Sequence, residues 1–377
     1  MKNGINGYLT MMAERKASDL FISAGIAPYL KIEGATKVME TAALTPAEVK
    51  ALVDEMMGPE QRNRFQKDKE ANFSLSLDQV ARFRVNVYYQ RGDVAIAVRL
   101  IPSAIPSLEE LGLPPEISQL AMVKRGLILV VGPGGSGKST TLASMINYRA
   151  THADAHILTI EDPIEFVFPR VRSLIDQREV GIDTLTYGDA LRNAMRESPD
   201  VIMIGEIRDQ ETAHHAIAYA ESGHLCISTM HANNASQAIE RILNYFPPDA
   251  HRQLLLDLSL HMEAVISQRL VHGLNGKRVA AVELLLNSSF ISEMIRQGRL
   301  SEIRREMEKG NQEGAITLDQ SLLALYQAGK IARHEALHNA DSHTEMALKI
   351  RLAEHHSPNE APAFTFSDPT WTAQPID

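Results

Sequence analysis

The sequence predicts an α/β fold in which a parallel sheet with crossover helices follows a smaller α+β domain. From residue 126 onward, short β-branched runs alternate with helical stretches, which is the pattern of consecutive βαβ units. These runs are 127–131, 157–160, 201–204 and 225–229. Before residue 100 the apolar residues instead alternate over short patches, as in a mostly antiparallel sheet. We therefore expect two domains.

Composition places the chain among soluble globular proteins. Of its 377 residues, 44% are hydrophobic and 23% are charged. The net charge is -9, whereas a protein whose main ligand is nucleic acid usually carries a positive field. We therefore expect no nucleic-acid partner. No apolar run approaches the roughly 20 residues that cross a bilayer, which argues against direct membrane insertion. A single cysteine, Cys226, and a start without a signal-like apolar core favour the cytoplasm.

Residues 1–100 form the first predicted domain. It begins with a mixed helical segment, and alternating apolar patches then predict its strands. These patches are 18–22, 29–32, 73–77, 83–89 and 94–100. Between them, Thr45 stands before a proline and three positions before Glu48, which predicts a capped helix that ends near Gly58. Four prolines then make 101–118 a stiff, extended linker.

The rest of the chain divides into three predicted parts. Residues 119–289 hold the parallel sheet. Charged segments with helical spacing follow and predict a helical cluster over 290–356. From 357 to 377 the residues Pro, Ser, Thr and Ala dominate and the periodicity disappears, which predicts a disordered tail.

The glycine-rich run after the first β-branched strand is a candidate phosphate-binding loop. Its glycines allow backbone N–H groups to face phosphate oxygens, the lysine can reach the β- and γ-phosphates, and the serine hydroxyl suits Mg²⁺. The predicted nucleotide-binding residues are Gly132, Gly134, Gly135, Ser136, Gly137, Lys138, Ser139 and Thr140. An ordinary strand-to-helix turn would not require the lysine and the serine in these places. The loop predicts nucleoside-triphosphate chemistry.

Two acidic segments follow later strands. Residues 161–165 hold three carboxylates directly after a strand, where one of them can orient or deprotonate water. Residues 200–206 form an apolar strand that ends in Glu206, as in a Walker B strand that supplies an acid to Mg²⁺. Gly205 stands where an aspartate is common. The alternatives are a solvated acidic loop for the first segment, a surface glutamate for the second, and a solvated turn at Arg208 and Asp209.

Two histidines, His224 and His231, flank the strand over 225–229. A histidine at a strand end can hydrogen-bond a γ-phosphate or a carboxylate and so report the nucleotide state. The alternative is a structurally paired histidine. A zinc site would need more ligands than these two histidines and the lone cysteine provide.

Taken in order, the four segments resemble the Walker A, Asp box, Walker B and His box of secretion-type ATPases, and most closely those of the type IV pilus retraction ATPases. The resemblance runs from about residue 1 to residue 350 and includes 18–22, 82–86 and 177–181. Within this family the chain is more similar to the accessory PilU type than to the PilT type. Residues 231–235 and the extended, charged C-terminus support this assignment. PilT-type proteins usually carry a motif close to Ala-Ile-Arg-Asn-Leu-Ile-Arg where this chain has Phe290-Ile291-Ser292-Glu293-Met294-Ile295-Arg296.

The resemblance implies a PAS-like amino-terminal domain, a RecA-like ATPase domain, and a homohexameric ring with nucleotide between the two domains. It implies that the phosphate loop, with Ser139 as a metal ligand, binds ATP and Mg²⁺. Glu165 would be the general base, Glu206 would support the metal, and His231 would sense the γ-phosphate. Arg84 and Arg99 would be arginine fingers, in a ring that packs one subunit's domain against another's active site.

The function implied by the resemblance is an ATP-hydrolysing hexameric motor that drives or supports type IV pilus retraction and twitching motility. It would work in the cytoplasm, at the inner face of the cell membrane, with a PilT-type retraction ATPase and an inner-membrane platform protein as partners. The alternative is an accessory ring that binds and stabilises another retraction ATPase without its own turnover. An extension ATPase, a secretion ATPase or a nucleic-acid translocase is a weaker interpretation, because the extension type usually has a cysteine-rich zinc insert.

Overall fold

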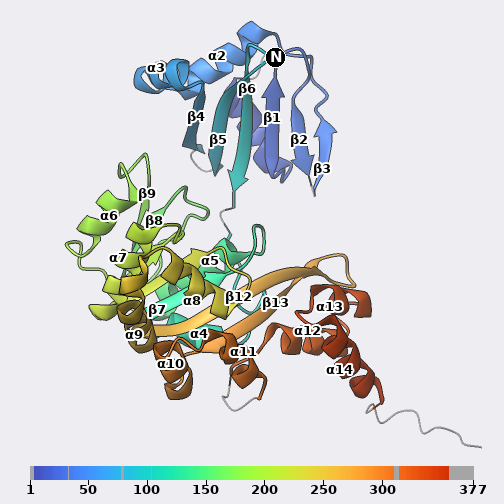
Figure 1. Ribbon diagram of the computed structural model, residues 1–377. Coiled ribbons are helices and arrows are strands. Elements are labelled where there is room, and N and C mark those ends of the chain that lie inside the picture. Colours follow the sequence, from blue (N-terminus) through green and yellow to red (C-terminus); the bar gives the residue numbers. More distant parts are fainter. Residues whose placement is uncertain (1–3, 33, 78–79, 103, 310–313, 356–377) are drawn as a thin grey trace, which may run out of the picture.

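The computed structural model describes residues 4–32, 34–77, 80–102, 104–309 and 314–355. It has an amino-terminal α+β part and a larger α/β part, joined after the last strand of the first sheet (Figure 1). This arrangement confirms the predicted fold class. The predicted tail over 357–377 lies outside the described residues.

The amino-terminal sheet is antiparallel throughout, with strand order β3-β2-β1-β6-β5-β4. Its strands are β1 (Asp19–Ser23), β2 (Tyr29–Ile32), β3 (Ala35–Val38), β4 (Glu70–Leu77), β5 (Ala81–Gln90) and β6 (Asp93–Ile101). Its helices are α1 (Ile5–Glu14), α2 (Pro46–Met56) and α3 (Pro59–Asp68). The sequence prediction missed β3, because all four of its residues are exposed and leave no apolar pattern. It also missed α3, which starts at the proline where we expected only the end of α2.

The capped helix predicted from Thr45 is confirmed as α2. The Thr45 side chain accepts a hydrogen bond from the backbone N–H of Glu48, and the Glu48 carboxylate accepts one from the backbone N–H of Thr45. This capping box satisfies donors that the first helical turn leaves unpaired. The helix then buries Val49, Leu52 and Val53 in the core of the amino-terminal part.

The second sheet has the order β13-β12-β7-β11-β10-β8-β9, and every pair in it is parallel except the β12–β13 hairpin. Its strands are β7 (Gly126–Val131), β8 (His156–Glu161), β9 (Leu174–Glu179), β10 (Val201–Ile204), β11 (Leu225–Met230), β12 (Met262–His272) and β13 (Arg278–Leu286). The four predicted parallel strands are β7, β8, β10 and β11. The prediction missed β9, because its sequence LIDQRE is largely polar, and β12.

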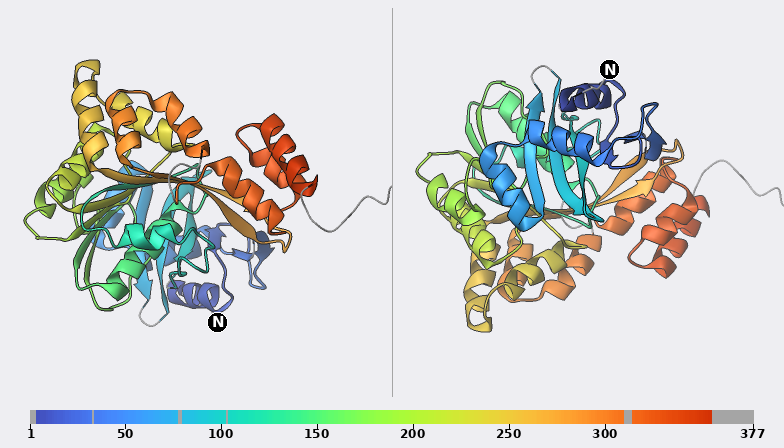
Figure 2. Two further views of the ribbon diagram at one scale, coloured as in Figure 1. Left: turned by 90° about the horizontal axis from the view of Figure 1, so that it is seen from below. Right: turned by 90° about the horizontal axis from the view of Figure 1, so that it is seen from above.

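Helices cover both faces of this sheet (Figure 2). One face is covered by α4 (Glu116–Ala121) and α5 (Lys138–His152). The other is covered by α6 (Tyr187–Ala194), α7 (Gln210–Glu221), α8 (Ala235–Asn244), α9 (His251–His261), α10 (Ser289–Arg296) and α11 (Leu300–Glu308). A 3-10 turn, η1 (Pro248–Ala250), precedes α9. With both faces buried, the central strands β7, β10 and β11 are buried along their whole length, as their apolar runs predict.

The last three helices pack separately from α10 and α11. They are α12 (Leu318–Gln327), α13 (Arg333–Asn339) and α14 (His343–His355), and they bury Val271 and Ala281 of the β12–β13 hairpin. Figure 2 shows this hairpin extending from the sheet toward them. Along the stretches that the structure describes, no helix is both long and apolar enough to cross a membrane.

Candidate functional site

The four sequence motifs meet at one edge of the parallel sheet. Strands β7, β8, β10 and β11 are adjacent and parallel, so the loops at their carboxyl ends lie side by side. In open α/β sheets this edge is where ligands bind. The motifs are far apart in the chain, and the strand order brings them together.

These loops enclose a cavity of about 260 Å³. The phosphate loop, the 161–165 loop and the segments after β10 and β11 all contribute to its lining. The polar and glycine residues of the lining are Gly134, Gly135, Lys138, Ser139, Glu161, Asp162, Glu165, Tyr187, Gly205, Glu206, Arg208, Thr229 and His231.

Glycine is required at the end of the phosphate loop. Gly137 has φ of 89°, in the left-handed region, and a Cβ atom there would lie 2.8 Å from Nε2 of Gln268. Gln268 also supports the loop from β12, because its Oε1 accepts a buried hydrogen bond of 2.7 Å from the hydroxyl of Thr141. The loop geometry therefore depends on a residue more than a hundred positions away.

The amino terminus of α5 faces the cavity at Lys138 and Ser139. Unpaired N–H groups at the start of a helix and the positive end of its dipole favour an anion there. The Lys138 ammonium donates to the carbonyls of Gly132 at 3.0 Å and Pro133 at 2.9 Å, and burial lowers its pKa. This cationic, donor-rich pocket can hold a polyphosphate.

The 161–165 loop presents two glutamates in different environments. Glu161 is only 5% exposed, and its carboxylate accepts hydrogen bonds from the Thr159 hydroxyl, the Gln177 amide and the backbone N–H of Glu165. Burial raises the pKa of Glu161 to about 7, against the effect of these hydrogen bonds. Glu165 is exposed on the cavity side, where its carboxylate can orient water.

Glu206 and His231 come together across the ends of β10 and β11. Nε2 of His231 lies 3.3 Å from Oε1 of Glu206, and both side chains are partly exposed in the cavity. The hydroxyl of Thr229 donates to the carbonyl of Gly205 at 2.6 Å and ties the two strand ends together. A histidine paired with a carboxylate at this point can respond to a new charge in the cavity.

Mg²⁺ fits the donors of this cavity. Ser139 and Glu206 supply one hydroxyl and one carboxylate oxygen, and Mg²⁺ in nucleotide sites is usually held by one or two protein oxygens together with phosphates and waters. A larger protein cage is not needed for this ion. The described residues contain no group of three or more His, Cys, Asp or Glu side chains that could hold a metal.

Several predicted phosphate-loop residues shape the cavity without lining it. They are Gly132, Ser136, Gly137 and Thr140. Gly132 leaves no room for a side chain, because a Cβ atom there would lie 2.4 Å from the carbonyl oxygen of Gln268. Ser136 has a buried hydroxyl that points away from solvent.

The structure does not bring His224 to the cavity. It precedes the first residue of β11, so it lies about 20 Å from the carboxyl end of that strand, given about 3.3 Å per residue. Its Nδ1 lies 3.0 Å from the hydroxyl of Ser222, and its carbonyl accepts from Gly126. His224 is therefore a structurally paired histidine, the alternative left open by its sequence.

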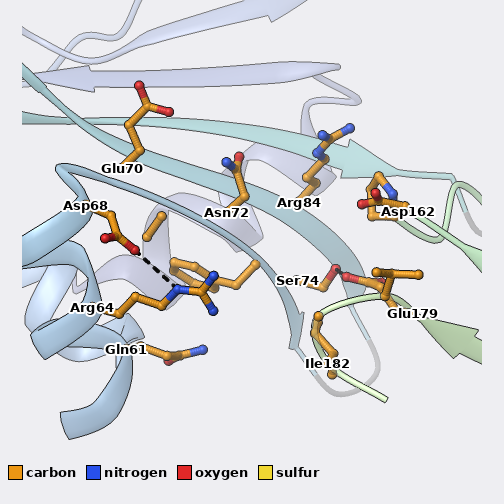
Figure 3. A pocket seen from close by; sticks show the side chains of 15 residues that line it. Gln61, Arg64, Asp68, Glu70, Asn72, Ser74, Arg84, Asp162, Glu179 and Ile182 are labelled. Carbon is orange, nitrogen blue, oxygen red and sulfur yellow. Dashed lines mark hydrogen bonds and ion pairs between the residues drawn. The ribbon is translucent and has the colours of Figure 1, made fainter. Parts of the chain in front are cut away.

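The two predicted arginine fingers lie next to each other on the amino-terminal sheet. Arg84 of β5 pairs in register with Arg99 of β6 and with Ser74 of β4, so all three share one face. Arg99 is occupied by an ion pair of 2.9 Å with Asp19. Arg84 and Asp162 line a second cavity, of about 320 Å³, between the two parts of the chain (Figure 3). Asp162 also lines the first cavity, so Arg84 stands beside the candidate site of its own chain.

Sequence reasoning assigned no site role to Arg208 and Tyr187. Arg208 donates to Asp162 at 3.3 Å and lies over the Tyr187 ring, and both residues line the cavity. Arg208 therefore lines the cavity and contacts two of its other residues, beyond the solvated turn that the sequence suggested. The only sequence signal for Arg208 was its position two residues after Glu206. Tyr187 had no such signal, because it comes after the polar strand β9, which was not predicted from the sequence.

The chain matches a known protein family over most of its length. The family model described as type II/IV secretion system protein matches residues 2–346. The chain is 45% identical to the type IV pilus ATPase PilU of Pseudomonas aeruginosa, over 91% of this chain and 90% of PilU. It is 40% identical to the type IV pilus retraction ATPase PilT of the same species, over 89% of this chain and 98% of PilT.

A solved structure shares the fold over nearly the whole chain. The crystal structure of the pilus retraction motor PilT with bound ADP has a TM-score of 0.86 and 41% sequence identity, and covers 91% of this chain and 98% of that one. The likeness confirms the predicted fold class. Together with the matches above, it shows that this chain belongs to the type II/IV secretion system protein family and, within it, to the type IV pilus retraction ATPases of the PilT and PilU type.

Proposed function

We propose that this protein hydrolyses ATP in a Mg²⁺-dependent reaction and uses the energy, as a homohexameric ring, to drive or support type IV pilus retraction and twitching motility. The observation that carries this proposal is the cavity that joins the phosphate loop to Glu165, Glu206 and His231. Membership of the pilus ATPase family supports the same chemistry.

In this proposal, the residues that line the cavity divide the tasks of binding phosphate, binding Mg²⁺ and activating water. The start of α5, with Lys138, holds the β- and γ-phosphates, and Ser139 and Glu206 hold Mg²⁺ through oxygen atoms. When bound, the ion neutralises charge on the phosphate oxygens. Glu165 accepts a proton from the attacking water. His231 senses the γ-phosphate through its contact with Glu206.

Arg84 and Arg99 are proposed to stabilise the charge of the transferring phosphoryl group. A guanidinium fork suits this task, because it spreads positive charge over several oxygens. Arg84 needs only to move across the cavity that it shares with Asp162. Arg99 must first leave Asp19, whose side chain is only 11% exposed, so its departure leaves a buried carboxylate that keeps the hydroxyl of Ser18 as a hydrogen-bond donor.

The same proposal places the ring in the cytoplasm, at the inner face of the cell membrane. Loss of the γ-phosphate changes the contacts of the loops and allows the two domains to rotate as rigid bodies. An inner-membrane platform protein would receive this motion, and a PilT-type retraction ATPase would be the partner ring. The domains taken to move are 1–100 and 119–289, joined by the linker over 101–118.

The test is ATP hydrolysis by the purified full-length chain. We predict Mg²⁺-dependent phosphate release that Lys138→Ala lowers by at least about a hundredfold, because it removes the cation that contacts the phosphates. Lys124→Ala is the matched control, since Lys124 is an exposed lysine outside the cavity. Equal rates for the wild type and Lys138→Ala would contradict the proposal.

A second candidate function is an accessory ring that stabilises another retraction ATPase without its own turnover. The observation that favours it is α10, where Phe290 is 55% exposed in place of the small first residue of the PilT-type motif. Complementation separates the two functions. In cells that lack this protein and carry excess unretracted pili, Lys138→Ala restores retraction only if turnover is dispensable.

A further inference from the structure

We propose that Glu179 is a positioning residue that ties the amino-terminal sheet to the loop carrying Glu165, so that ATP hydrolysis depends on how the two parts of the chain are docked. This inference rests on the proposed function. It concerns neither the phosphate loop nor the arginine fingers.

Glu179 is the last residue of β9 and is only 3% exposed. Two side chains of the amino-terminal sheet reach its carboxylate. The hydroxyl of Ser74, from β4, donates to Oε1 at 2.7 Å. Figure 3 shows these two side chains next to each other. Nη2 of Arg82, from β5, donates to Oε2 at 2.6 Å. A charge-assisted hydrogen bond of this length is among the strong polar contacts in proteins.

The same carboxylate also holds the loop of the candidate site. Oε2 of Glu179 accepts from the backbone N–H of Ile164 at 3.3 Å, one residue before Glu165. One oxygen atom therefore contacts both Arg82 of the amino-terminal part and the backbone of the loop that presents Glu165.

A second side chain of β9 holds the far end of this loop. The side-chain amide of Gln177 makes both contacts. Its Nε2 donates to the backbone carbonyl of Phe166, and its Oε1 accepts from the backbone N–H of Phe168. Gln177 and Glu179 point to the same side of the strand, because they are two residues apart. Both ends of the 164–168 loop are thus fixed by β9, and only the Glu179 end depends on the amino-terminal part.

Docking therefore controls the loop through the charge on Glu179. When Arg82 withdraws, the buried carboxylate loses its counter-charge and must turn toward water, because an unpaired buried charge is strongly unfavourable. That rotation takes Oε2 away from Ile164. Glu165 then loses its support, and a displacement of about 1 Å at a catalytic group can lower a rate by about a hundredfold.

The experiment compares Glu179→Gln and Arg82→Gln with the wild type, in the full-length protein. We expect kcat to fall about tenfold or more in each variant, while the Kd of a fluorescent ADP analogue changes less than about twofold, because the phosphate loop is untouched. The double variant should be no slower than the slower single one, since both break the same contact. Arg172→Gln, which breaks an exposed ion pair of 2.6 Å with Asp154, is the control that leaves both values unchanged.

Hydrogen exchange gives a readout that does not need turnover. We expect the amides of 162–168 to exchange faster in Glu179→Gln and Arg82→Gln, and those of the phosphate loop to stay as in the wild type. This measurement keeps the inference testable if the protein hydrolyses no ATP, in which case only the proposed function fails. If a charge variant folds poorly, Ser74→Ala removes one hydrogen bond and should give a smaller change of the same kind.

Two results would overturn the inference. One is unchanged kcat and unchanged exchange of the loop in both charge variants. The other is a parallel loss of kcat, nucleotide affinity and thermal stability, which would make Glu179 a structural residue without a specific effect on Glu165.

Discussion

Glu161 is the last residue of β8 and Glu165 lies four residues later in the loop that follows, and only Glu165 is exposed. Glu161 is buried under hydrogen bonds from Thr159 and Gln177, and it uses a carboxylate oxygen to hold the backbone of Glu165. Its role is to support the loop, while the exposed Glu165 is free to meet water. Both residues are glutamates, so their different roles come from their different burial. Burial of Glu161 disfavours its charged form, whereas Glu165 is exposed.

Stability should therefore depend on pH through Glu161. Its pKa is raised by burial from 4.5 to about 7, so the folded chain binds this proton more tightly than the unfolded chain. The resulting stabilisation is fully present below pH 4.5 and is lost as the pH rises through 7. We predict that the free energy of unfolding, measured in urea relative to Glu161→Gln, falls by about 2 kcal/mol between pH 5 and pH 8.

A second buried glutamate provides an internal comparison for this measurement. Burial also raises the pKa of Glu283 to about 7, and its carboxylate accepts from the N–H of Ala235 at the start of α8. Glu283→Gln should remove a similar share of the pH dependence. Stability curves of the wild type and Glu161→Gln that run parallel from pH 5 to pH 8 would contradict the prediction.

Among the elements, α2 and β9 show what sequence patterns can and cannot predict. The start of α2 follows from Thr45, Pro46 and Glu48, whose interactions are local. Strand β9 has no apolar pattern that would predict it, because several of its residues are polar. These polar residues become buried only through contacts with segments that are distant in the sequence. Gln177 and Glu179 became interpretable once β9 was placed at the sheet edge, next to β8.

The capping box makes a prediction at this scale. Thr45→Ala removes the hydroxyl that accepts from Glu48 N–H and should lower the free energy of unfolding of the amino-terminal part by about 1 kcal/mol. Chemical denaturation measures this change. Thr41→Ala, at an exposed threonine in the preceding loop, is the control. A loss for Thr45→Ala no larger than that for Thr41→Ala would show that the cap does not stabilise α2.

At the scale of the whole molecule, the amino-terminal sheet contacts the ATPase part through Ser74 and Arg82. The family resemblance led us to expect a ring in which one subunit's domain packs against another's active site. In the described chain, Arg84 already shares a cavity with Asp162 of the same subunit. We therefore infer that Arg84 acts on the nucleotide of its own chain.

Mixed rings test this inference. Arg84→Ala removes the proposed finger, and Glu165→Gln removes the proposed base. If both residues serve one site in the same chain, rings formed from equal amounts of the two variants should hydrolyse ATP no faster than the mean of the separate variants. Recovery to about a quarter of the wild-type rate, the share of intact neighbouring pairs in random rings, would show that Arg84 acts on the adjacent subunit.

The chemistry of the phosphate loop and the α/β class could be predicted from the sequence, because both depend on neighbouring residues. A turn needs its glycines within a few positions, and a buried parallel strand is apolar along its own length. The acidic segments 161–165 and 200–206 followed from the same reasoning, since each lies at the end of such a strand, and the choice of Glu165 as the base came from the family resemblance.

Only the tertiary structure decided which of the candidates meet. It placed His231 in the cavity and His224 at the opposite end of the same strand, although their sequence contexts looked alike. It also gave Glu179 and Arg82 their pairing across 97 positions. Strand order and burial arise from packing over the whole chain, and no local pattern of residues records them.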